Sequence, residues 1–186
     1  MTIAPSIDVH SHFYPRAFLD LIEKQGNRYN VRCSFEDPVG PVIEMNGHRL
    51  LPLDERYFDL EARLRSMDDQ GVDMHALSLT IPMVYWAPRD LSRQLSEVFN
   101  DACMEAHEQY PDRFVGLAML PMQEPSLAIA ELGRVENHPA IRGVYMATRI
   151  GERELSDSAL FDVYERIEDL GLTIFLHPVT VVDPTR

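Results

Sequence analysis

The stretch IDVHSHFYP, from Ile7 to Pro15, places two histidines one residue apart near the start of the chain. Its alternating apolar residues and its closing proline are typical of a strand that ends there. Because side chains alternate along a strand, Asp8, His10 and His12 are expected to share one face, with Val9 on the other. Two such imidazoles start about 7 Å apart along the backbone and can converge on one ion at about 2.0 to 2.1 Å.

The rest of the chain alternates between β-rich runs and helical patterns. Strands are expected over Ser6–His12, Met74–Thr80, Phe114–Leu120, Ile141–Thr148 and Leu172–His177. Helices are expected over Arg16–Gln25, Asp59–Gln70, Leu91–Tyr110, Ser126–Val135 and Ala159–Leu170. Strand–helix–strand alternation at this spacing predicts an α/β fold with parallel strands.

One segment, residues 29–53, breaks this rhythm. It is rich in Val, Ile, Phe, Gly and Pro, and Asn46-Gly47 lies between the apolar runs VIEM and HRLL as in a hairpin. We therefore expect a small antiparallel insertion after the first strand. An open doubly wound sheet and a closed barrel both fit the overall pattern, but neither a G-x-G-x-x-G fingerprint nor a P-loop motif is present.

A third histidine, His177, ends the fifth expected strand in GLTIFLHP. The carboxyl ends of parallel strands are where α/β folds place their chemistry. Three imidazoles leave a coordination position open, as in catalytic rather than structural zinc sites. An H-x-H pair alone is more often incidental than metal-binding. The conjunction of strand ends and a matching histidine on a later strand favours the metal site.

The motifs IDVHSHFYP, MDDQGVD, YPDRFVGLAMLP, AIRGVYMAT and GLTIFLHP resemble the amidohydrolase superfamily. They are most similar to its amidohydrolase-related (amidohydrolase 2) branch, which contains aminocarboxymuconate-semialdehyde decarboxylase. The resemblance covers nearly the whole chain and implies a TIM (β/α)8-type barrel with a catalytic divalent metal, usually zinc. It assigns His10, His12 and His177 as metal ligands.

The chain holds only about the first five βα units of such a barrel. Residues 1–186 are therefore expected to be the N-terminal part of a single barrel domain, with the insertion at about 29–53. A longer polypeptide or another chain would complete the fold. The family's catalytic histidine follows strand six and its metal-binding aspartate follows strand eight. Both lie beyond this chain, so the catalytic residue stays unassigned.

Two residues are candidates for substrate binding. Relatives use an arginine near the position of Arg49, in the hairpin, to hold a substrate carboxylate, and an arginine fork suits a carboxylate. Trp86, with Tyr85 beside it in TIPMVYWAP, follows the second strand and offers a flat surface to an aromatic or dienoic substrate. The alternatives are a solvated hairpin arginine and aromatic side chains packed against the next helix. Arg149, after the fourth strand, is a second possible carboxylate partner.

The composition limits the partners and the compartment. A formal net charge of -13 and a pI near 4.8 argue against nucleic acid and anionic membranes, but not against a small carboxylate substrate. Two cysteines without a disulfide framework, and no secretory signal or membrane-spanning run, favour a reducing cytoplasm. The resemblance also implies a possible homodimer.

These observations lead to three functional hypotheses. The first, implied by the resemblance, is a metal-dependent decarboxylase that acts on an unsaturated or aromatic carboxylic acid without an organic cofactor. The second is a metal-dependent hydrolase of the same superfamily that uses a metal-bound hydroxide and the same three histidines. The third is a non-catalytic half-barrel that needs a partner chain.

Overall fold

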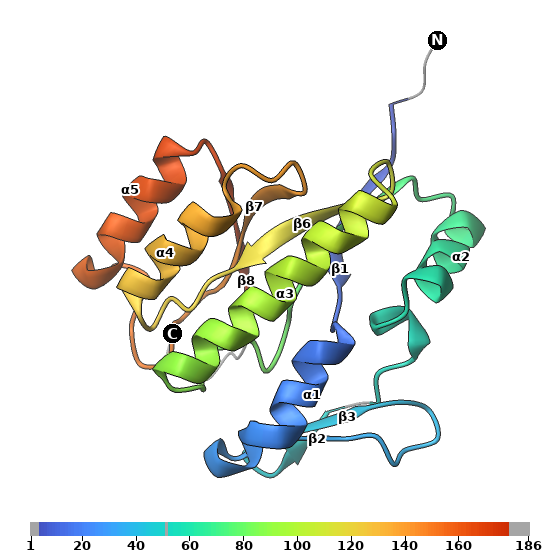
Figure 1. Cartoon of the computed structure of the whole chain (residues 1–186), viewed down its shortest axis with the longest axis horizontal. Coiled ribbons are helices and arrows are strands. Elements are labelled where there is room, and N and C mark those ends of the chain that lie inside the picture. Colours follow the sequence, from blue (N-terminus) through green and yellow to red (C-terminus); the bar gives the residue numbers. More distant parts are fainter. Residues whose placement is uncertain (1–3, 51, 179–186) are drawn as a thin grey trace.

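The computed structural model describes residues 4–50 and 52–178. Its main sheet has five parallel strands in the order β1-β5-β6-β7-β8 (Figure 1). They are β1 (Ile7–His12), β5 (Met74–Ser78), β6 (Phe114–Met119), β7 (Ile141–Ala147) and β8 (Thr173–His177). Each expected run coincides with one of these strands, so the predicted parallel α/β sheet is confirmed.

Helices connect successive strands and cover the sheet from one side. They are α1 (Arg16–Gln25), α2 (Leu60–Gln70), α3 (Arg89–Gln109), α4 (Pro125–Val135) and α5 (Phe161–Asp169), with the short 3-10 turns η1 (Gly26–Tyr29), η2 (Glu55–Tyr57) and η3 (Ser158–Leu160). Helix α3 packs against α1 and α4, and α4 packs against α5 (Figure 1). Along α3, residues Leu91, Leu95 and Phe99 recur every four positions and are buried, as one apolar helix face requires.

The predicted insertion is a second, antiparallel sheet that packs on α1. Its strands are β2 (Val31–Ser34), β3 (Val42–Met45) and β4 (His48–Arg49). Asn46 and Gly47 join β3 to β4 with φ angles of 52° and 77°. Two consecutive positive φ angles are what a two-residue type I′ hairpin needs, which explains the Asn-Gly pair.

The main sheet is an arc with two open edges. Within residues 4–50 and 52–178, β1 pairs only with β5, and β8 pairs only with β7. Apolar side chains on these two strands are exposed: Ile7 and Val9 on β1, and Leu176 on β8. The fold is therefore the expected half-barrel: it supplies five strands of a (β/α)8 architecture, and helices follow the first four of them in the described ranges. No helix in the described ranges combines the length and the apolar character that crossing a membrane requires.

Strand β1 contains a bulge that the sequence did not reveal. Asp8 pairs with His75, but Ser11 pairs with Leu77, so β1 has one more residue than β5 in this interval. The bulge reverses the alternation of side chains between Asp8 and the end of the strand. The prediction that Asp8 shares a face with the two histidines was therefore wrong. Instead, its Oδ1 accepts a hydrogen bond from the backbone N–H of His10 at 2.9 Å.

Candidate metal centre

Three histidines meet at the carboxyl ends of the two edge strands of the sheet. His10 and His12 come from β1 and His177 from β8, and one ring nitrogen of each lies within 4.8 Å of the others. The ring centroid of His177 is 5.2 Å from those of both other rings. The Nε2 atoms of His10 and His12 are 3.0 Å apart. The arc of the sheet thus brings His177 close to His10 and His12, which lie 165 positions or more before it in the sequence.

The chemical state of these rings suits a divalent cation. Burial first, and then the neighbouring rings of His10 and His177 and the cation Arg63, lower the pKa of His12 to about 4. Burial, with His10 as a smaller cause, also lowers the pKa of His177. Both imidazoles are therefore neutral at pH 7, as metal ligands must be. In addition, Nδ1 of His177 is buried and has no hydrogen-bond partner in the described part of the chain.

The distances support the same conclusion. Two nitrogens that bind one ion at about 2.1 Å each lie about 3.0 to 3.4 Å apart when the angle at the ion is between 90° and 109°. The Nε2 atoms of His10 and His12 already have this separation. The three residues therefore fit a divalent metal ion, with the remaining coordination positions left to groups outside the triad.

Two residues that sequence reasoning missed surround the triad. Ser78, the last residue of β5, lies opposite His12, and its Oγ is 3.2 Å from Nδ1 of that ring. Tyr145 on β7 is 3% exposed, and its ring centroid lies 5.4 Å from that of His177 and 6.1 Å from that of His12. Burial raises the pKa of the Tyr145 phenol to about 12. Ser78 lies opposite β1 and Tyr145 lies opposite β8 in the sheet. These positions could have identified both residues only if the pairing of the strands had been known.

A buried cation, the side chain of Arg63, contacts the carboxyl end of β1. The guanidinium of Arg63, on α2, donates to Oγ of Ser11 at 2.5 Å and to the backbone carbonyl of His12. The same group lies 3.3 Å from Nδ1 of His75, which is also 2.8 Å from Oγ of Ser11. Burial lowers the pKa of Arg63 to about 10 and that of His75 to about 4. Arg63 therefore ties both backbone and side-chain groups of β1 to α2.

The predicted substrate residues lie in the insertion and in the loop after β5. Arg49 is exposed on β4, and its Nη2 donates to Oδ2 of Asp37 at 2.7 Å. Trp86 is half-buried, and its Nε1 donates to the backbone carbonyl of Met83 at 3.0 Å. Its ring centroid lies 6.3 Å from that of Tyr29. Neither residue is part of the histidine cluster.

The two weaker candidates, Tyr85 and Arg149, also lie outside the histidine cluster. Tyr85 is half-buried, its hydroxyl is buried, and burial raises the pKa of the phenol. Arg149 follows β7, and its guanidinium contacts the Glu152 side chain at 3.4 Å and lies 4.0 Å from Glu154. Arg149 is therefore engaged with acidic residues of its own loop.

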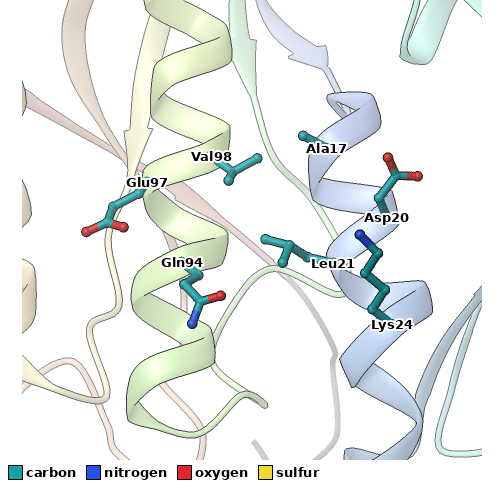
Figure 2. Close-up of a pocket in the computed structure, with 7 residues that line it drawn as sticks. All are labelled: Ala17, Asp20, Leu21, Lys24, Gln94, Glu97 and Val98. Atoms are coloured by element: carbon teal, nitrogen blue, oxygen red, sulfur yellow. The ribbon is translucent and has the colours of Figure 1, made fainter.

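A shallow groove of about 320 Å³ lies elsewhere, between α1 and α3 (Figure 2). Its lining is made of Ala17, Asp20, Leu21, Lys24, Gln94, Glu97 and Val98. None of the histidines and none of the predicted substrate residues line this groove. It is a surface feature of the helical layer, separate from the ends of the strands.

Comparison with known proteins identifies the family. Residues 7–185 match the family described as Amidohydrolase. The chain belongs to the amidohydrolase family. This amidohydrolase is 29% identical over 182 residues to 2-amino-3-carboxymuconate-6-semialdehyde decarboxylase of Dictyostelium discoideum. The alignment covers 97% of the chain and 50% of that protein. It is 37% identical over 138 residues to gamma-resorcylate decarboxylase of Rhodococcus jostii. This alignment covers 68% of the chain and 42% of that protein.

A solved structure shares the fold of this amidohydrolase. The 5-carboxyvanillate decarboxylase of Novosphingobium aromaticivorans, complexed with manganese and a nitrobenzoic acid, superposes with a TM-score of 0.73 at 22% identity. The match covers 97% of the chain and 53% of that structure. The chain thus spans about half the length of the relatives that it matches.

Proposed function

We propose that the completed barrel is a divalent-metal-dependent decarboxylase that releases carbon dioxide from an aromatic or unsaturated carboxylic acid without an organic cofactor. The observation that carries this proposal is the convergence of His10, His12 and His177 at the carboxyl ends of β1 and β8. The names of the relatives favour decarboxylation over hydrolysis, because both curated relatives described above are decarboxylases. The proposal concerns the whole protein, of which this chain is the part that supplies the three imidazoles.

The bound ion would supply a positive charge that holds substrate oxygen atoms and stabilises negative charge as the C–C bond breaks. The three histidines would hold that ion through ring nitrogens, and burial favours the neutral, metal-binding form of His12 and of His177 by lowering the pKa of each. We propose Zn²⁺ as the ion, since three imidazoles and an open position are a common zinc arrangement. Manganese, present in the 5-carboxyvanillate decarboxylase structure, is the main competitor.

We propose that Arg49 binds a carboxylate of the substrate. A guanidinium has five N–H donors in a planar fork, and the bond to Asp37 engages Nη2. Asp37 would then orient the fork while other donors face the ligand. We propose that Trp86 contributes the face of its ring, since its N–H is already bonded to the Met83 carbonyl.

Two further expectations belong to this proposal. Cys33 and Cys103 are both buried and unpaired, which suits the reducing cytoplasm that we propose for the protein. A small carboxylate is the proposed ligand, and we propose a homodimer as the assembly. Sedimentation of the full-length protein would test the assembly separately from the chemistry.

The test is a carbon dioxide assay on the full-length polypeptide loaded with Zn²⁺ or Mn²⁺. The substrates are gamma-resorcylate, 5-carboxyvanillate and an unsaturated amino-carboxylic semialdehyde. Carbon dioxide release that stops after chelation and returns with metal would support the proposal. Ester, lactone or amide hydrolysis without carbon dioxide would overturn it in favour of a hydrolase.

A pair of variants tests the role of Arg49. Arg49→Ala should raise KM by about 10- to 100-fold, because it removes a charge-assisted contact to the substrate carboxylate. Arg65→Ala is the matched control, since Arg65 is equally exposed and lies 4.0 Å from Glu55. An unchanged KM in Arg49→Ala would remove this residue from the proposed site.

A further inference from the structure

Ser78 lies directly opposite His12 where β5 pairs with β1. It is fully buried, with an exposed fraction of 0%. Its Oγ lies 3.2 Å from Nδ1 of His12 and 3.4 Å from the backbone carbonyl oxygen of Ser11. The hydroxyl thus lies beside the Ser11 carbonyl, which can only accept a proton, and beside the His12 ring and the Tyr145 phenol, each of which can donate or accept one.

These contacts determine where the proton of the imidazole lies. A carbonyl oxygen has no proton to give, so Ser78 donates its O–H toward Ser11 and turns an oxygen lone pair toward Nδ1 of His12. Nδ1 must then carry the ring N–H and donate it to Ser78. A neutral imidazole has only one N–H, so Nε2 of His12 is left with a free lone pair.

The neighbouring ring agrees with this arrangement. Nε2 of His10 lies 3.0 Å from Nε2 of His12, which is the separation of two nitrogens that bind one ion. With Nδ1 of His12 protonated, the lone pair of its Nε2 faces the centre of the triad, beside Nε2 of His10. If Ser78 instead donated to His12, the proton would sit on Nε2 and block that atom.

We propose that Ser78 is a positioning residue that fixes His12 in the tautomer whose Nε2 can bind the metal ion. This inference deepens the proposed function, because it concerns the metal site on which the chemistry depends. The partner of a metal-binding imidazole sets its tautomer and orientation, and losing such a partner typically costs 10- to 100-fold in metal affinity.

The first test reads the tautomer directly, in the metal-free chain. Long-range ¹H–¹⁵N correlation spectra distinguish protonated from unprotonated ring nitrogens, and a His12→Gln variant assigns the His12 signals among the seven histidines. We expect Nδ1 of His12 to carry the proton at pH 7. A proton on Nε2 would overturn the proposal, whatever the metal affinity or the activity of the protein.

The second test measures Zn²⁺ and Mn²⁺ affinity by calorimetry, without any assay of activity. Ser78→Ala should lower the affinity about 10- to 100-fold and give a mixture of His12 tautomers. Ser78→Thr, which keeps the hydroxyl, should restore both properties. Ser96→Ala is the matched control, because Ser96 is equally buried and its Oγ has no hydrogen-bond partner in the described ranges.

The outcomes separate this inference from the proposed function. An unchanged tautomer and unchanged metal affinity in Ser78→Ala would overturn the role of Ser78 even if the enzyme releases carbon dioxide. A protein that shows the expected tautomer and the expected loss of affinity, but no decarboxylation, would refute the proposed function alone. If Ser78→Ala does not fold, the tautomer measured in the unsubstituted chain still decides the question.

Discussion

The Nε2 atoms of His10 and His12 lie 3.0 Å apart, close enough for both to bind the same ion. Their rings meet at 77° with centroids 4.7 Å apart, so the two nitrogens converge while the rings do not stack. This relationship arises because the residues are two positions apart on β1, with His10 inside the bulged interval and His12 just beyond it. The ring of His177 then reaches the same point from the opposite edge of the five-stranded arc.

Removing any one imidazole should therefore weaken metal binding strongly. We expect His10→Ala, His12→Ala and His177→Ala each to lower Zn²⁺ affinity by at least about 100-fold, since the loss of a direct ligand exceeds the effect of losing its outer partner. Calorimetry on the purified chain measures this effect. His48→Ala, at an exposed histidine of β4, should bind metal as the unsubstituted chain does. Equal affinity in all four variants would show that the metal binds elsewhere.

The metal-free chain should lose stability as the pH falls from 7 to 5. The pKa values of His12 and His75 lie near 4 in the folded state, below the usual 6.5, so the unfolded state binds more protons in this interval. Their contribution to stability is present above pH 6.5 and is lost as the pH falls toward 4. With a discount for partial exposure, the expected loss by pH 5 is about 1 to 2 kcal/mol for each histidine.

Urea denaturation across this pH range checks the prediction. A His75→Gln variant should show a clearly smaller pH dependence, because one of the histidines whose pKa is lowered in the folded state no longer titrates. His138→Gln is the control, since the ring of His138 lies beside exposed Glu108 and does not contact Arg63, Ser11 or the histidine triad in the described residues. A slope that stays the same in His75→Gln would contradict the assignment.

Arg63 should be far more important for stability than its neighbour Arg65. Its guanidinium donates to Ser11 and to the carbonyl of His12 from a site that is 5% exposed. Lysine cannot reproduce this fork, so Arg63→Lys should lower the free energy of unfolding by about 2 to 4 kcal/mol. Arg65→Lys, on the exposed face of the same helix, should change it by less than about 0.5 kcal/mol. Chemical denaturation of both variants makes the comparison, and equal values would refute it.

Much of the fold could be predicted because it depends on local patterns. The five strands of the main sheet and the five helices follow from apolar periodicity. The β3–β4 turn follows from the Asn46-Gly47 pair, which accommodates the positive φ angles that the structure shows there. The three histidines were identifiable because each lies at a strand end. Ser78 and Arg63 could not be identified from the sequence. The role of Ser78 depends on the residue opposite it in the sheet, and that of Arg63 depends on the strand residues that contact its helix. That information is in the strand register, which no local pattern contains.

The bulge in β1 is the clearest example, and it gives the last prediction. Oδ1 of Asp8 accepts the N–H of His10 at 2.9 Å, while its Oδ2 lies 3.8 Å from Nε2 of His75. The first contact holds the backbone of a metal ligand in its irregular conformation. It needs only an acceptor oxygen and no charge.

Asp8→Asn should therefore keep Zn²⁺ affinity within about threefold of that of the unsubstituted chain, because the amide oxygen still accepts the bond. Asp8→Ala should lower the free energy of unfolding by about 1 kcal/mol and the Zn²⁺ affinity about tenfold, because the N–H of His10 loses its partner and the ring loses its fixed position. Calorimetry and denaturation on both variants distinguish the two effects. If Asn and Ala weaken binding equally, the charge of Asp8 acts on the site, and the backbone role of this residue is wrong.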